Sequence, residues 1–151
     1  MATFALTGND SLLINDRVIH DYTDGSTIEI AYQNDRVGIS TGKDDNTVFS
    51  DNRQGGNAVL TLRILRGSTD DAFFNGLSVQ QERDLPAFTL LNGSFSKRIG
   101  DGQGNITYDN YTLLGGAFQR YPDTQENLQG DTEQGTTVYQ IIFAKAQRAL
   151  T

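Results

Sequence analysis

Residues 100–139 read GDGQGNITYDNYTLLGGAFQRYPDTQENLQGDTEQGTTVY, and this stretch decides the fold. Two segments rich in glycine, asparagine and acidic residues, 100–105 and 130–135, flank strand-like runs. Such residues favour turns because they tolerate positive φ or hydrogen-bond their own backbone. The stretch therefore predicts a β-hairpin with long loops. It has no pattern typical of an active site, and its polar loops are suited to contact other molecules.

The last apolar run, residues 136–146, alternates with apolar side chains on both of its faces. In an extended chain Val138 and Ile142 point one way, and Tyr139 and Phe143 point the other way. A strand that is apolar on both faces is expected to be covered on both sides. The run therefore predicts a doubly buried strand, and residues 147–151 carry only a weak strand signal.

Two irregular places precede this strand. The apolar pattern within residues 106–114 changes phase, which predicts a β-bulge near residues 109–110. Upstream, Asn92-Gly93 separates two strand-like runs at 87–91 and 94–97. Two separate strand-like runs on either side of Asn92-Gly93 are therefore expected.

The N-terminal half contains the strongest strand pattern, at residues 58–66. Ala58, Leu60, Leu62 and Ile64 share one face of this run, which indicates a half-buried strand. Asn15-Asp16 is typical of a two-residue hairpin turn. Further strands are predicted at residues 12–14, 17–22, 27–33, 36–41 and 47–50, with a polar loop at 42–46.

The period changes after residue 67, where a helix is predicted over residues 69–83. Ser68 is a favourable N-cap, and Asp70 and Asp71 place negative charge in the first turn. Phe73 and Leu77 lie four residues apart and form one apolar stripe. Pro86 ends the helix because it pushes the preceding residue out of helical geometry.

Together these elements predict a mainly β protein: a β-sandwich or barrel with one flanking α-helix at about residues 69–83. At 151 residues the chain is expected to form a single domain, residues 1–151. The net charge of −7 disfavours binding to nucleic acid or anionic membranes. Cysteine is absent from the sequence, which excludes disulfides and thiolate metal sites. No signal peptide and no membrane-spanning run is recognised, so cytoplasmic synthesis without membrane insertion is expected.

Candidate chemistry is weighed against plainer roles. His20 is the only histidine, and in an extended strand Asp21 beside it would point away, so we interpret it as a surface or interface residue rather than a catalytic one. Glu126 and Glu133 are a weak candidate for a glycosidase pair, because no tryptophan is present to stack a sugar. We therefore predict no enzymatic activity and no cofactor.

The loop at residues 100–105 has two interpretations. A plain hairpin loop is favoured. A single weak calcium site that uses Asp101, Asn105 or Asp109 is the alternative, although the run of carboxylates and the terminal glutamate of a calcium loop are absent.

Several segments, in this order and spacing, resemble the tail tube proteins of contractile-tailed bacteriophages, which are related in fold to the inner tube of type VI secretion systems. No single motif carries the resemblance, and it covers nearly the whole chain. The segments are DGST at 24–27, TGKDDN at 41–46, LRGSTDD at 65–71, residues 99–105, GGAF at 115–118 and GDTEQ at 130–134.

The resemblance implies a structural virion protein that assembles in the host cytoplasm into the tail. Such subunits form hexameric rings that stack into a tube with a β-lined channel, inside a contractile sheath. Their partners are other copies, the sheath protein, and baseplate and tail-terminator proteins. Phage DNA would pass through the channel during genome ejection without specific binding, and the acidic charge of this chain fits such a channel.

Two polar segments, residues 41–53 and 121–135, are predicted to contact neighbouring rings or the sheath. The candidate contact residues in them are Lys43, Asp44, Asp45, Asn46, Asp123, Glu126, Asp131 and Glu133. Three alternatives stay open: a type VI-like inner-tube subunit, a tube-initiator ring, and a monomeric carbohydrate-binding β-sandwich. A hydrolase would need a convergent acid–base set, which the sequence does not offer.

Overall fold

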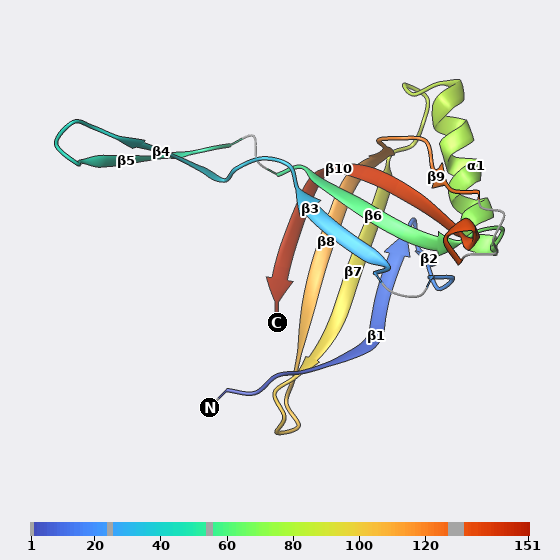
Figure 1. Ribbon diagram of the computed structural model, residues 1–151, viewed down its shortest axis with the longest axis horizontal. Coiled ribbons are helices and arrows are strands. Elements are labelled where there is room, and N and C mark those ends of the chain that lie inside the picture. The colour runs from blue at the N-terminus through green and yellow to red at the C-terminus, as the bar shows by residue number, and fades with distance from the viewer. Residues whose placement is uncertain (1, 24–25, 54–55, 127–131) are drawn as a thin grey trace.

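The computed structural model describes residues 2–23, 26–53, 56–126 and 132–151 (Figure 1). It is mostly β, with 54% of residues in strands and a single α-helix among the described residues. The predicted mainly β class is therefore confirmed. The elements in order are β1 (Ala5–Ile14), β2 (Arg17–Val18), β3 (Ile28–Tyr32), β4 (Val37–Thr41), β5 (Thr47–Asp51), β6 (Ala58–Leu65), α1 (Thr69–Arg83), β7 (Leu91–Gly100), β8 (Ile106–Phe118), β9 (Asp123–Thr124), the 3₁₀ turn η1 (Thr132–Gly135) and β10 (Thr136–Leu150).

The strands form one large antiparallel sheet and one small one. The large sheet has the order β2-β1-β7-β8-β10-β6-β3, with β9 paired to β10. Strand β10 pairs with β8 in register, which confirms the hairpin predicted from residues 100–139. Strands β4 and β5 pair only with each other in a separate two-stranded sheet. Figure 1 shows this hairpin projecting from one end of the molecule, and α1 lying at the other end.

The core lies on one face of the large sheet, under α1. The predicted inward face of β6 is confirmed, because Ala58, Leu60, Leu62 and Ile64 are all fully buried. Phe74 on α1 is also fully buried and contacts two aromatic rings of the sheet. The remaining buried apolar residues are Leu12, Ile14, Ile19, Val59, Leu91, Leu113, Phe118, Tyr139, Ile141, Phe143 and Ala146.

Helix α1 begins and ends where the sequence indicates. The Ser68 side chain accepts a hydrogen bond from the Asp71 backbone N–H at 3.2 Å, which satisfies one of the free amides of the first turn. Asp84 is the C-cap, two residues before Pro86. The Tyr139 hydroxyl donates to the Asp71 carboxylate at 2.5 Å, so the start of the helix is held against β10.

The Asn15-Asp16 turn is also confirmed. Both residues have positive φ, 51° and 64°, as a two-residue hairpin turn that follows the twist of its strands requires. The turn joins β1 to β2, where Leu13 and Ile14 lie opposite Val18 and Arg17.

The separation of two strand-like runs at Asn92-Gly93 is wrong, because both residues lie inside the continuous strand β7. Asn92 contacts the Asn15 turn through two hydrogen bonds, and its side chain accepts a third from Gly115. A Cβ atom on Gly93 would lie 2.7 Å from the Ile14 side chain. The glycine here permits a close approach between strands, not a reversal of the chain.

The bulge predicted near residues 109–110 is also wrong, since Asp109 and Asn110 pair with β7 without a shift in register. The change of phase occurs further on and involves both central strands. Leu113 pairs with Ala146, and Gly116 pairs with Phe143. All four residues are buried, although residues three apart in a regular strand point to opposite faces of the sheet. Gly115, which lies between the two pairs and has a φ of 68°, marks this irregularity in β8.

Two predictions about β10 need correction. Its Tyr139–Phe143 side is buried, but Val138 and Ile142 on the other side are only partly buried, so the strand is not covered on both faces. Residues 147–150 continue the strand because β8 is long enough to pair with them.

No α-helix in the described part of the chain is long and apolar enough to cross a membrane.

Candidate assembly surface

Strands β4 and β5 with the turn between them, residues 37–51, project from the body of the protein, and we call them the arm (Figure 1). The arm continues the β3–β6 hairpin outward. Hydrogen bonds from the Gln33 N–H to the Asn57 carbonyl and from the Asn52 N–H to the Arg36 carbonyl link its base to that hairpin. Every residue of β4 and β5 is exposed. Neither strand makes an extensive contact with another described element.

One side of the arm is apolar. Residues that lie opposite each other on paired strands share a face, and Ile39 lies opposite Phe49. Val37, two residues before Ile39 in β4, lies on the same face opposite Asp51, which ends this face. We call Val37, Ile39 and Phe49 the apolar face of the arm. Ile39 is 66% and Phe49 is 69% exposed. The other side carries Ser40, Val48 and Ser50, and is more polar.

Four of the predicted contact residues form the tip of the arm. Lys43, Asp44, Asp45 and Asn46 close the β4–β5 turn, where the Gly42 N–H donates to the Asn46 carbonyl at 2.8 Å. Asp45 has a φ of 68°, a conformation that aspartate tolerates better than most residues. The sequence interpretation of residues 41–53 as a polar hairpin was incomplete, because it missed the apolar face next to this polar tip.

Strand β9, which carries one of the other four predicted contact residues, lies at the opposite end of the molecule, close to α1 (Figure 1). Asp123 lies in β9, opposite Val138 of β10. Glu126 forms an ion pair with Arg66 at 2.5 Å, with both side chains exposed. Asp131 lies outside the described residues, and Glu133 lies in η1, where its side chain is not described. The structure therefore does not bring the two predicted contact segments together.

A second exposed feature is the edge of β1. Strand β7 pairs with one side of β1, and β2 pairs with the other side only at Leu13 and Ile14. Along residues 5–11 the outer edge of β1 therefore has no neighbouring strand among the described residues. Phe4 and Leu6, which are 72% and 64% exposed, lie at this end of the strand. An unpaired strand edge is a place where another chain can add a strand.

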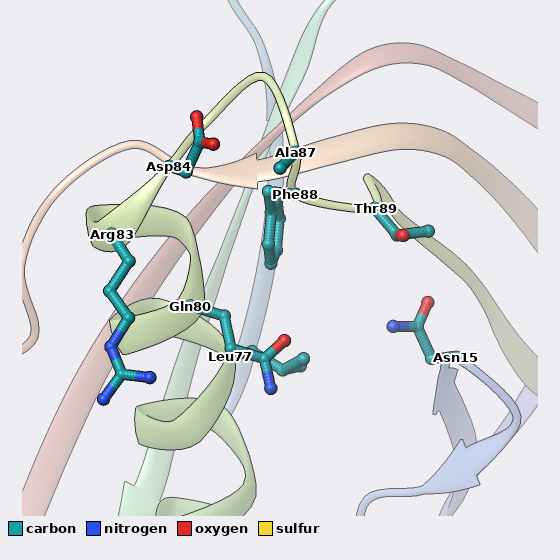
Figure 2. A pocket seen from close by; sticks show the side chains of 8 residues that line it. All are labelled: Asn15, Leu77, Gln80, Arg83, Asp84, Ala87, Phe88 and Thr89. Carbon is teal, nitrogen blue, oxygen red and sulfur yellow. The ribbon is translucent and has the colours of Figure 1, made fainter.

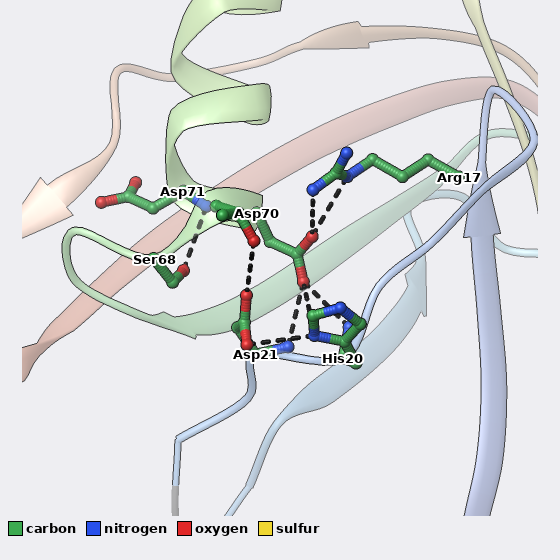
Figure 3. Close-up of polar contacts among 7 residues, drawn as sticks. Arg17, His20, Asp21, Ser68, Asp70 and Asp71 are labelled. Carbon is green, nitrogen blue, oxygen red and sulfur yellow. Dashed lines mark hydrogen bonds and ion pairs between the residues drawn. The ribbon is translucent and has the colours of Figure 1, made fainter.

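A buried polar cluster ties β2 and the following segment to the start of α1 (Figure 3). Asp70 is fully buried, and its carboxylate accepts hydrogen bonds from the backbone N–H groups of His20 and Asp21 at 2.9 and 3.0 Å. Arg17 donates to the same carboxylate at 3.1 Å. Burial alone would raise the pKa of Asp70, but these hydrogen bonds outweigh it and the pKa is lowered.

His20 and Asp21 do meet, contrary to the expectation that Asp21 would point away. The His20 ring lies 3.0 Å from the Asp21 carboxylate, because this segment is not a regular strand. The three groups His20, Asp21 and Asp70 are close enough to suggest a metal site. The Asp70 carboxylate, however, already accepts hydrogen bonds from Arg17 and from two backbone amides. We therefore interpret the cluster as structural, because it holds the segment after β2 against the start of α1. Sequence spacing could not reveal it, since its members are about 50 residues apart.

A groove of about 440 Å³ lies between the end of α1 and the segment that leads to β7 (Figure 2). Leu77 and Phe88 supply apolar surface, and Arg83 and Asp84 are its charged residues. Among the described residues of its lining, Asp84 is the only carboxylate and none is a histidine. These residues do not form the acid and base pair typical of a hydrolase.

The loop after β7 is a hairpin loop, as favoured from the sequence. The Asp101 carboxylate accepts hydrogen bonds from the Gln103 and Asn105 backbone N–H groups and from the Asn105 side chain. These bonds lower the pKa of Asp101, led by the bond from the Asn105 side chain. Asp109, the third residue of the calcium alternative, is held by Arg148 at 2.8 Å.

Comparison with known proteins gives a fold but no family. No protein-family model and no curated protein matches the chain. Among solved structures, the chain is similar to the tube terminating cap of the anti-feeding prophage, with a TM-score of 0.61 and 8% identity, over 96% of this chain and 90% of that one. It is also similar to the sheath/tube terminator of an extracellular contractile injection system, PVC, with a TM-score of 0.55 and 14% identity, over 95% and 94% of the two chains. At these identities the likeness concerns the fold.

Proposed function

We propose that this chain is a structural, non-enzymatic subunit of a contractile tail or contractile injection particle, in which several copies form a ring at the tube. The observation that carries the proposal is the shared fold over more than nine-tenths of this chain with two proteins that terminate such tubes. The exposed arm and the unpaired edge of β1 support it, because both are surfaces that another molecule can cover.

Two forms of this function differ in what the ring does. The sequence predicts an inner tail tube, in which hexameric rings stack inside a sheath around a channel for DNA. The names of the structural neighbours favour a terminator, in which a single ring closes the tube and also contacts the sheath. In either form, we propose that the tip residues Lys43, Asp44, Asp45 and Asn46, and the segment that contains Asp123 and Glu126, contact a neighbouring ring or the sheath.

Electron microscopy of the purified protein over a range of concentrations tests the proposal. Hollow tubes of constant diameter would support the inner-tube form, whereas single rings that do not stack would support the terminator form. A protein that stays monomeric at the highest concentration, alone and with preformed tubes and sheath, would contradict both. Glycan binding by that monomer would instead favour the carbohydrate-binding alternative.

A further inference from the structure

We propose that the arm pairs along the unpaired edge of β1 in a second copy of this chain, with the apolar face of the arm against Phe4 and Leu6 of that copy. This inference rests on the proposed ring function and identifies the two surfaces that would join its subunits. It moves the main contact from the polar tip of the arm, which the sequence indicated, to Val37, Ile39 and Phe49 in its middle.

The arm needs a cover that no other described element of its chain provides. An isolated two-stranded hairpin is marginally stable in water, and it becomes stable when a third strand or a packed element joins it. The nine residues 33–41 span roughly 30 Å when extended, which carries the arm beyond the body (Figure 1). The apolar face therefore lies where only another molecule can reach it.

The edge of β1 has the properties that such a partner requires. Its outer backbone groups along residues 5–11 have no strand beside them among the described residues. Phe4 and Leu6 offer apolar side chains next to that edge. Addition of a strand to an open edge gains affinity from main-chain hydrogen bonds and selectivity from alternate side chains. The arm can supply both, since the outer edges of β4 and β5 have no neighbouring strand among the described residues, and apolar side chains lie on the face beside them.

The arm and the β1 edge are different surfaces, so the contact between copies is heterologous. A heterologous contact either closes into a ring or continues as a filament, depending on the rotation between neighbours. A symmetrical contact between two arms would instead stop at a dimer. The inferred contact is therefore compatible with a ring in a way that pairing of two arms is not.

The absence of cysteine from the sequence makes a cross-linking experiment direct. Ile39→Cys and Leu6→Cys variants, each with a tag of a different size, would be mixed and treated with a short bis-maleimide. We expect a cross-linked heterodimer under native conditions, and at least tenfold less of it in 6 M urea. Ser40→Cys, on the opposite face of β4, is the matched control and should cross-link to Leu6→Cys far less.

The outcomes separate this inference from the function on which it rests. Rings in the microscope without the Ile39–Leu6 product would overturn the inferred contact and leave the ring function standing. An Ile39→Cys variant that cross-links mainly to itself would also overturn it, in favour of pairing between arms. Absence of both rings and product would overturn both.

A charge substitution gives a second readout that does not depend on cross-linking. Phe49→Asp should abolish rings and leave a folded monomer, because Phe49 is exposed and does not pack against the described core. Ser50→Asp adds the same charge to the other face of β5 and should leave the rings intact. If both variants lost their rings to the same extent, or if neither did, a contact made by the apolar face would be contradicted.

Discussion

The inner and outer halves of one long hairpin differ in how far their apolar side chains are buried. In the inner half, Ile30 on β3 lies opposite Leu60 on β6, and the pair forms part of the core. In the outer half, Ile39 on β4 lies opposite Phe49 on β5, and both are mostly exposed. The residue types and the alternation are alike in the two halves. The alternating pattern therefore indicates where a strand forms. Whether its apolar face is buried depends on which other element packs against that face.

The sharpest test of this comparison removes one apolar side chain from each half. Leu60→Ala should lower the free energy of unfolding by about 3 kcal/mol, because it leaves a cavity in the core. Ile39→Ala should change it by less than about 0.5 kcal/mol in the monomer, because the side chain is already in water. Urea denaturation of dilute protein measures both values. Similar losses in the two variants would mean that the arm is covered within its own chain.

Removal of a carboxylate charge should also distinguish the body from the arm. Asp70→Asn should cost about 2 kcal/mol at pH 7, because it weakens hydrogen bonds to a buried charged group. The folded-state pKa of Asp70 is lowered, so its contribution is present above pH ~4 and is lost as the pH falls through the folded pKa. The difference between wild type and variant, measured in urea at pH 7 and below pH 4, should therefore shrink on acidification. Asp51→Asn on the exposed arm is the control and should change little.

Glycine substitutions compare the space around the two backbones. Gly116→Ala should destabilise the protein by about 1.5 kcal/mol, because a Cβ atom there would lie 2.4 Å from the ring of Phe143. Gly38→Ala on the arm should be close to neutral, because the nearest atom to its Cβ would be 4.0 Å away. Thermal denaturation of both variants checks the pair. An unchanged melting temperature in Gly116→Ala would show that the Phe143 ring moves aside.

The smallest effect is expected at the tip of the arm. Asp45→Gly should stabilise the β4–β5 turn by a few tenths of a kcal/mol, because glycine adopts a φ of 68° without strain. Amide hydrogen exchange in β4 and β5 is the suitable measurement, since global unfolding would not register so local a change. Faster exchange in the variant would indicate that the Asp45 side chain itself holds the turn.

Local features of the fold could be predicted from the sequence, and contacts between distant segments could not. Ser68 and Pro86 set the bounds of α1, and Asn15-Asp16 gave a correct turn, since each acts on its immediate neighbours. Asn92-Gly93 was misread because its role depends on Ile14, which is far away in the sequence. The contact of Asp70 with Arg17 and the exposure of the arm escaped prediction for the same reason.

The pairing of β1 with β7 has a consequence for the order in which the chain folds. Among the described residues, β7 is the only partner strand of β1 along residues 5–11, and the Asp10–Lys97 ion pair between them joins residues 87 positions apart. The arm, in contrast, closes a hairpin between near neighbours, and such local contacts form quickly. During synthesis the contacts that close the arm can therefore form before β1 meets its partner strand. The edge of β1 is thus completed later than the arm to which we propose it binds.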